Sequence, residues 1–108
     1  MAEKDTDLLS VSQAIELAQG SLNLIPTISI IGEVSGFRGP SRSGHCYFSI
    51  KDDSSSLDVI IWGGVYAART FDLRDGLKIC FDGKFGIYPA TGKMSFKVSS
   101  FSLVGEAY

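Results

Sequence analysis

The sequence predicts a mainly β domain, a small five-stranded barrel with a helix in front of it. Three observations lead to this fold class. Apolar and polar residues alternate along several segments after residue 27, as they do in half-buried strands. Glycines stand inside two of these segments, at Gly32 and Gly83, where the strands of a small barrel must bend. Before Pro26 the apolar residues recur at helical spacing instead.

The first 26 residues divide into a charged start and a helix. Residues 1–9 are predicted to be a disordered start. We expect an amphipathic helix from Leu8 to Leu24, opened by Ser10 or Val11, with Ser12 as a candidate cap. Gly20 weakens the helix, and Pro26 closes the segment. Residues 10–108 then form one domain, a size that can bury its own core.

Strand-like alternation continues from there to the end of the chain. The expected strands cover about 27–37, 45–51, 57–62, 77–88 and 93–103, with a short helix at 65–73. Five strands with a helix between the third and the fourth predict the OB-fold, a partly open Greek-key barrel. The alternation places these residues inward: Ile28, Ile30, Gly32, Val34, Cys46, Phe48, Ile50, Leu57, Val59, Ile61, Ile79, Phe81, Gly83, Phe85, Ile87, Met94, Phe96 and Val98.

Composition narrows the function classes. The formal net charge is −2, so the strongly basic surface typical of duplex binders is missing. After residue 26, however, the chain has nine cationic and eight anionic residues, a net charge of +1. No apolar run is long enough for a membrane helix and no secretory signal opens the chain, so we expect a cytoplasmic protein without a membrane partner. Cys46 and Cys80 are isolated and one histidine cannot complete a zinc site, which predicts free thiols, no metal and no cofactor.

The predicted fold indicates where a ligand would bind. OB-fold barrels bind oligonucleotides across strands two and three, between the loops joining strands one to two and four to five. Aromatic rings on that face can stack on bases, and cations can neutralise phosphates, which favours single-stranded nucleic acid. The candidate binding residues are Phe37, Arg38, Arg42, Ser43, His45, Tyr47, Lys51, Trp62, Tyr88 and Lys93.

Structural roles remain open for several of these residues. The rings of Phe37, Tyr47 and Trp62 could pack under loops, the two arginines could be solvated, and His45 could bond to the backbone. Catalytic signals are weak. The Asp52–Asp53 pair lies in a serine-rich turn, and neighbouring residues of an extended chain point to opposite sides. No phosphate-cradling glycine motif is present, so this chain alone is not expected to be an enzyme.

Two stretches resemble a known family. Ile-Gly-Glu-Val-Ser at 31–35 and Ser-Gly-His-Cys-Tyr-Phe-Ser-Ile-Lys-Asp at 43–52 are similar to the N-terminal domain of the exodeoxyribonuclease VII large subunit. The segments at 87–92 and 11–15 also resemble that domain, so the similarity spans about residues 10–105. The resemblance implies an OB-fold module that holds single-stranded DNA for an exonuclease acting from DNA ends. It implies as partners the rest of the large subunit, several small subunits and single-stranded DNA.

The resemblance also has consequences for activity. In the family the catalytic domain follows this module, so a chain ending at Tyr108 would be a fragment or a stand-alone module without nuclease activity. Gly36 stands where the family usually has asparagine, and Gly63 where it often has arginine after the aromatic residue at 62. These departures and the near-neutral charge leave an alternative open, an OB-fold scaffold that contacts proteins and not nucleic acid.

Overall fold

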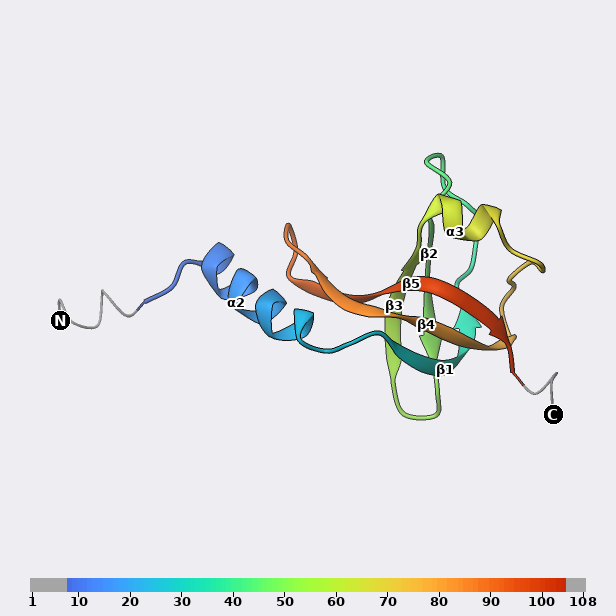
Figure 1. Ribbon diagram of the computed structural model, residues 1–108, viewed down its shortest axis with the longest axis horizontal. Helices are drawn as coiled ribbons and strands as arrows, with labels where there is room; N and C mark the ends of the chain where they lie inside the picture. Colours follow the sequence, from blue (N-terminus) through green and yellow to red (C-terminus); the bar gives the residue numbers. More distant parts are fainter. Residues whose placement is uncertain (1–7, 105–108) are drawn as a thin grey trace.

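The computed structural model describes residues 8–104, so the predicted disordered start falls almost entirely outside the described residues, as does the end of the domain (Figure 1). Residues 8 and 9 are exposed and have no regular structure. Five strands and two helices follow, which confirms the predicted fold class. The elements are α2 (Val11–Asn23), β1 (Ile28–Ser35), β2 (Cys46–Lys51), β3 (Ser56–Ile61), α3 (Gly63–Ala67), β4 (Lys78–Tyr88) and β5 (Lys93–Leu103).

The five strands close into a barrel in the order β1-β2-β3-β5-β4. The β3–β5 pair is parallel and every other pair is antiparallel. Strand β1 serves both halves of the barrel, because residues 28–33 pair with β4 and residues 33–35 pair with β2. Gly32 lies at this change of partner, and a Cβ there would come within 2.9 Å of the Cβ of Ile50. Close packing against Ile50 therefore favours glycine at this position.

The core fills the barrel as the alternation predicts, with two exceptions in β5 and one in β4, where Ile87 was expected inward but is only partly buried and lies outside the core cluster. Met94 was expected inward but is 48% exposed, because the β4–β5 hairpin extends past the barrel at this point. Phe101 was not expected in the core but packs against it. The buried hydrophobic residues are Val34, Cys46, Phe48, Ile50, Val59, Ile61, Tyr66, Leu73, Ile79, Phe81, Phe96 and Val98.

A bulge explains the position of Phe101. Asp82 pairs with Ser100 and Gly83 with Val98, so Ser99 is left without a partner and the inward register changes from even to odd residues. A Cβ on Gly83 would lie 2.1 Å from the carbonyl oxygen of Lys97, so only glycine fits at this close approach. The glycine inside the fourth strand therefore marks a bulge, as the sequence indicated.

The short helix is smaller than predicted. It begins at Gly63 and ends at Ala67, whereas the sequence indicated a helix over 65–73. The buried Tyr66 ring explains why the following segment can leave the helix: its hydroxyl accepts a hydrogen bond from the Leu73 amide at 3.3 Å. Helix α3 and this segment together cover one end of the barrel with apolar side chains.

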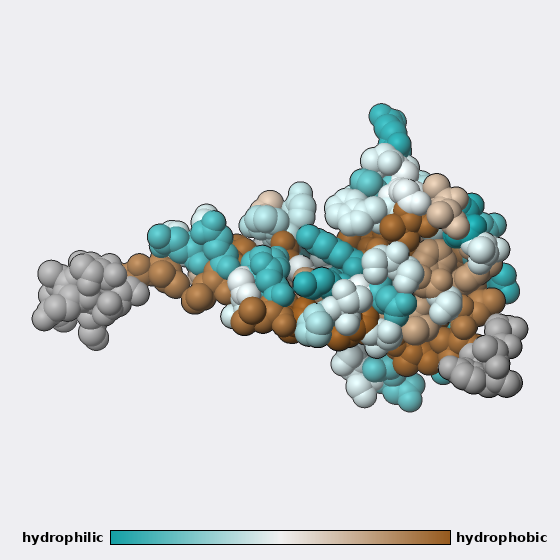
Figure 2. Space-filling model, in the orientation of Figure 1, coloured by the Kyte–Doolittle hydropathy of each residue, from teal (hydrophilic) through white to brown (hydrophobic). Residues whose placement is uncertain are grey.

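Helix α2 lies beside the hairpin and not over the core (Figure 1). Ser10, and not Ser12, caps it: Ser10 Oγ accepts from the Gln13 amide at 3.1 Å, and Gln13 Oε1 accepts from the Ser10 amide at 2.9 Å. Gly20 does not end the helix, which continues to Asn23. None of its residues is buried, and Figure 2 shows apolar surface along it.

The helix is tied to the hairpin by polar contacts. Gln19 Oε1 accepts a hydrogen bond of 2.7 Å from the Ile87 amide, and Lys84 Nζ donates to the carbonyl of Asn23 at 3.4 Å. Strand β1 pairs with β4 only as far as Gly83, so α2 partly covers the edge that β1 leaves open. Neither helix of the described part of the chain is long and apolar enough to cross a membrane.

Candidate nucleic-acid interface

A groove of about 620 Å³ runs between the outer face of β2–β3 and the β4–β5 hairpin. Neighbouring residues of three strands form its floor: Tyr47 of β2 lies opposite Ile60 of β3, and Ile60 lies beside Lys97 of β5 in the parallel pair. The groove is lined by Tyr47, Phe48, Ser49, Asp58, Val59, Ile60, Trp62, Ile87, Tyr88, Pro89, Thr91, Lys93, Met94, Ser95 and Lys97. These residues come from the strands and the hairpin turn that the predicted fold assigned to ligand binding.

Three aromatic rings are accessible in this groove. Tyr47 is 57% exposed, Trp62 43% and Tyr88 62%. Tyr47 and Trp62 therefore do not pack under other parts of the described chain, which was the alternative left open by the sequence. Large, partly exposed rings offer flat apolar faces on which bases can stack.

His45 contacts Trp62 and the backbone next to it. The Nδ1 atom accepts a hydrogen bond of 2.7 Å from the Gly63 amide, and the two rings meet edge to face with centroids 4.6 Å apart. Nδ1 can accept this bond only when it carries no proton. The bond therefore requires the tautomer that is protonated at Nε2. His45 therefore bonds to the backbone, as the structural alternative has it, and its ring contacts Trp62.

Gly63 has a packing role at the same point. A Cβ on Gly63 would lie 3.3 Å from the carbonyl carbon of Gly44, which is tighter than almost all real Cβ contacts. Position 63, where the family often has arginine, is therefore a point of close approach between two backbone segments. This approach brings the end of the 36–45 loop against the start of α3.

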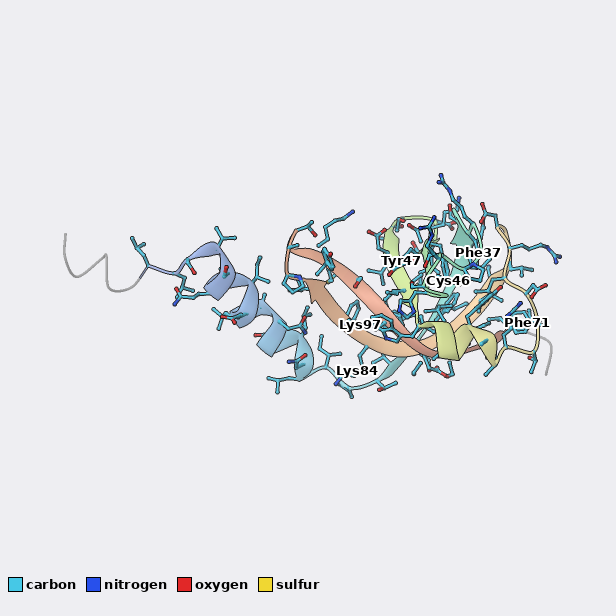
Figure 3. All side chains as sticks on the ribbon, turned by 90° about the horizontal axis from the view of Figure 1, so that it is seen from above. Phe37, Cys46, Tyr47, Phe71, Lys84 and Lys97 are labelled. Carbon is cyan, nitrogen blue, oxygen red and sulfur yellow. The ribbon has the colours of Figure 1, made fainter. Side chains whose placement is uncertain are left out.

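The charged residues of the groove are Asp58, Lys93 and Lys97, and the sequence analysis missed Asp58. Lys93 Nζ lies 3.3 Å from Asp58 Oδ2, and Ser49 Oγ donates to Asp58 Oδ1 at 3.1 Å. Lys97 crosses Gly86, where a Cβ would meet its Cε at 2.9 Å (Figure 3). Strand register could have found Asp58, because it shares the outward register of Ile60.

Phe37 lies away from the groove. Its ring packs against Phe48 with centroids 5.3 Å apart and against Tyr66 at 5.7 Å, so it belongs to the packing around the core (Figure 3). The alternation fails here because β1 ends at Ser35 and Gly36 turns the chain with a φ of 74°. The structural alternative for Phe37 is therefore the one observed.

The start of the 36–45 loop is fixed by a carboxylate. Asp75 accepts hydrogen bonds from the amide of Phe37 at 2.8 Å and from that of Gly36 at 3.1 Å. The three other predicted loop residues, Arg38, Arg42 and Ser43, are exposed and none lines the groove. Ser43 Oγ shares a hydrogen bond of 3.0 Å with Ser41 Oγ.

The structure thus brings together four of the predicted site residues and separates the others. Tyr47, Trp62, Tyr88 and Lys93 line one groove, and His45 touches its edge through Trp62. Lys51 lies outside it, 3.9 Å from Glu33 in an exposed ion pair. Met94, Ile87 and Asp58 are lining residues for which the sequence analysis had given a core role or none.

The polar groups in the described part of the chain do not assemble a metal or redox centre. Between residues 8 and 104 no three His, Cys, Asp or Glu side chains come together as metal ligands would. Both cysteines are free, and burial raises the pKa of the Cys46 thiol. The amides of Ser54 and Ser55 donate to Asp52 and lower the pKa of its carboxyl, which makes Asp52 a turn residue.

Solved structures with the same fold include two from replication protein A, one of them bound to single-stranded DNA. A replication protein A heterotrimer bound to single-stranded DNA superimposes with a TM-score of 0.59 at 11% identity, covering 74% of this chain and 58% of that one. The second OB-fold domain of replication protein A from Methanococcus maripaludis gives 0.58 at 14% identity, covering 77% and 88%. At these identities the likeness shows the OB-fold alone.

Curated relatives are closer in sequence. The exodeoxyribonuclease 7 large subunit of Agrobacterium fabrum is 36% identical over 78 residues, which cover 72% of this chain and 15% of the relative. That of Rhizobium etli is 31% identical over 96 residues, covering 89% and 17%. The chain therefore spans about a sixth of the length of these relatives.

A family model sets the assignment for the whole domain. The model described as an OB-fold nucleic acid binding domain matches residues 9–102, which include both helices and nearly all of the barrel. This chain belongs to the family of OB-fold nucleic acid binding domains, and it matches the N-terminal region of exodeoxyribonuclease 7 large subunits.

Proposed function

We propose that this domain binds single-stranded DNA in the groove between β2–β3 and the hairpin, as the DNA-binding module of an exodeoxyribonuclease VII large subunit. The observation that carries the proposal is the meeting of three accessible rings, Tyr47, Trp62 and Tyr88, with two lysines in one groove. Bases stack on such rings regardless of sequence, at about 1–3 kcal/mol per base.

The arrangement favours single strands over duplexes. A base can reach a ring only when it is unstacked from its neighbours, which a single strand permits at little cost. The cations near the groove are few, Lys93 and Lys97 inside it and two arginines in the adjoining loop, and the net charge of the chain is −2. A duplex ligand would instead need a broad basic surface.

The proposed place of the domain in a nuclease follows from its relatives. The relatives are named exodeoxyribonuclease 7 large subunits, and this chain corresponds to about a sixth of their length. In our proposal the domain holds a single strand while the rest of such a large subunit, assembled with small subunits, hydrolyses it from an end. The groove supplies binding and no catalytic group to that reaction.

A fluorescence titration tests the binding step. A labelled mixed-sequence oligonucleotide of about ten nucleotides should bind at low salt and weaken as salt rises from about 50 to about 200 mM. The same sequence as a duplex should bind more weakly, because its bases are not available to the rings. If neither form binds at the lowest salt, the proposal is overturned and the scaffold alternative, which the near-neutral charge favours, takes its place.

A further inference from the structure

We propose that Asp58 makes the groove select bases that carry an exocyclic amino group, so that cytosine binds better than thymine or uracil. This inference rests on the proposed function, because it names which bases the same groove prefers. Stacking alone is indifferent to base identity. A selective group must therefore reach the hydrogen-bonding edge of a base, and the groove contains one acidic side chain that can do so.

Asp58 is one of the residues that line the groove. It comes from the outward register of β3, two residues before Ile60 and opposite Ser49 of β2. Residues two apart on a strand are about 7 Å from one another, and Tyr47 lies opposite Ile60, so a base stacked on Tyr47 brings its edge near this carboxylate. The Asp58 side chain is half exposed, which leaves it accessible to a ligand.

The hydrogen bonds around Asp58 leave it free to accept more. An ionised carboxylate has about four acceptor sites and no donor. Ser49 Oγ occupies one site of Oδ1, and Lys93 Nζ lies beside Oδ2. The remaining sites can accept from the N4 amino group of cytosine or the N6 amino group of adenine, a pairing that carboxylates make with bases. Thymine and uracil have no amino group, and their one donor on this edge, N3–H, lies between two carbonyl oxygens that the negative charge repels.

The same charge arrangement orients the strand. A carboxylate inside the groove repels phosphates, and Lys93 is paired with it, whereas Lys97 attracts them from the hairpin side. The bases therefore turn toward the β2–β3 face and the backbone runs along the hairpin, which places base edges at Asp58.

Matched homopolymers test the selectivity. Oligo-dC and oligo-dU of about ten nucleotides differ only at C4, which carries an amino group in cytosine and a carbonyl in uracil, and in the proton on N3. Uracil is used in place of thymine because the thymine methyl group would add a difference in stacking. At neutral pH and low salt, we expect oligo-dC to bind at least about fivefold more tightly, which is the lower end for a hydrogen-bonded base contact.

The variant Asp58→Asn should bring this ratio close to one, because an amide can donate as well as accept. Asp53→Asn makes the same chemical change in the exposed turn outside the groove and should leave the ratio unchanged. Thermal unfolding followed by circular dichroism checks that both variants are folded.

Each other outcome is decisive. If Asp58→Asn changes the affinities for oligo-dC and oligo-dU by the same factor, Asp58 only restrains Lys93 and the inference is overturned. Equal affinities of the unmodified domain for the two homopolymers overturn the inference and leave the proposed function standing. If no oligonucleotide binds, the proposed function and the inference fail together.

Discussion

The two arms beside the β2–β3 face, the 36–45 loop and the β4–β5 hairpin, were both predicted to contact a ligand, yet they differ in what they offer. The hairpin contributes Tyr88, Lys93 and Lys97 to the groove, whereas no residue of 36–45 lines it. A paired ladder, α2 and a bulge hold the hairpin in place. The loop is held at one end by Asp75 and at the other by its contact with Gly63.

This difference shows that side-chain positions can be predicted more reliably from cross-strand pairing than from the sequence of a loop. In the hairpin, each outward residue of β5 is fixed by its partner on β4, so the row leading to Lys93 can be predicted once the register is known. In the loop, a single glycine with positive φ at Gly36 directs Phe37 toward the core. We therefore expect the hairpin to determine affinity and the loop to act indirectly.

The largest effect should come from the bulge that curves the hairpin. Gly83→Ala places a methyl group 2.1 Å from the Lys97 carbonyl oxygen, so β4 and β5 must separate locally. We expect the free energy of unfolding to fall by about 3 kcal/mol or more, measured by urea denaturation. Gly20→Ala is the control, because nothing lies within 4 Å and alanine favours a helix by about 1 kcal/mol. Equal stabilities of the two variants would contradict the role of the bulge.

Removal of a groove ring should be next in size. Tyr47→Ala and Trp62→Ala should each weaken oligonucleotide binding by about 1–3 kcal/mol without unfolding the domain, because each removes one stacking face. Ile31→Ala is a matched control: Ile31 is 54% exposed on a strand, as Tyr47 is at 57%, but it does not line the groove. If a folded Tyr47→Ala, Trp62→Ala double variant binds as the unmodified domain does, DNA does not use this face.

His45 tests the indirect action of the loop. His45→Ala removes the acceptor of the Gly63 amide and the ring that meets the edge of Trp62, so binding should weaken by about 1 kcal/mol. In a Trp62→Ala background the same change should have almost no effect on affinity, because the two residues act as a unit. Additive losses in the titration would instead show that His45 contacts DNA itself.

The base of the hairpin should respond to acid. Hydrogen bonds from Ser29 and Ser100 lower the pKa of the Asp82 carboxyl and link β1 and β5 to β4. A carboxyl whose pKa is lower in the folded state stabilises it at neutral pH and loses that contribution as pH falls through the folded pKa.

Asp82→Asn should therefore cost about 0.5–1 kcal/mol of unfolding free energy at neutral pH and much less below about pH 3, since these groups are partly exposed. Urea denaturation at both pH values measures this difference. A constant cost of Asp82→Asn across the acid range would contradict the role of the charge.

The smallest effect should come from the loop cations. Arg42→Ala should reduce the slope of log affinity against log salt by at most about 0.7, the value for one phosphate of a single strand. Lys97→Ala, inside the groove, should reduce it by about that full amount. An unchanged slope for Arg42→Ala would make the arginine a bystander, and a larger loss than for Lys97→Ala would reverse the comparison between the arms.

Much of the fold was available from the sequence because its signals are local. Alternation identified the five strands and most of the core, and Gly83 marked the bulge. The candidate site was predicted less completely. Tyr47 and Trp62 followed from strand register, whereas Met94 was assigned inward because alternation cannot tell where a hairpin leaves the barrel.

The sequence by itself determined the strands, the presence of two helices and most of the residues that face the core, since these depend on residues near one another in the chain. Only the tertiary structure decided that Phe37 packs inward, that His45 contacts Trp62, and that Asp58 stands among the rings. Each of these positions depends on a neighbour from another strand or loop. The physical reason is that barrel closure brings such neighbours together, and no local pattern encodes that distance.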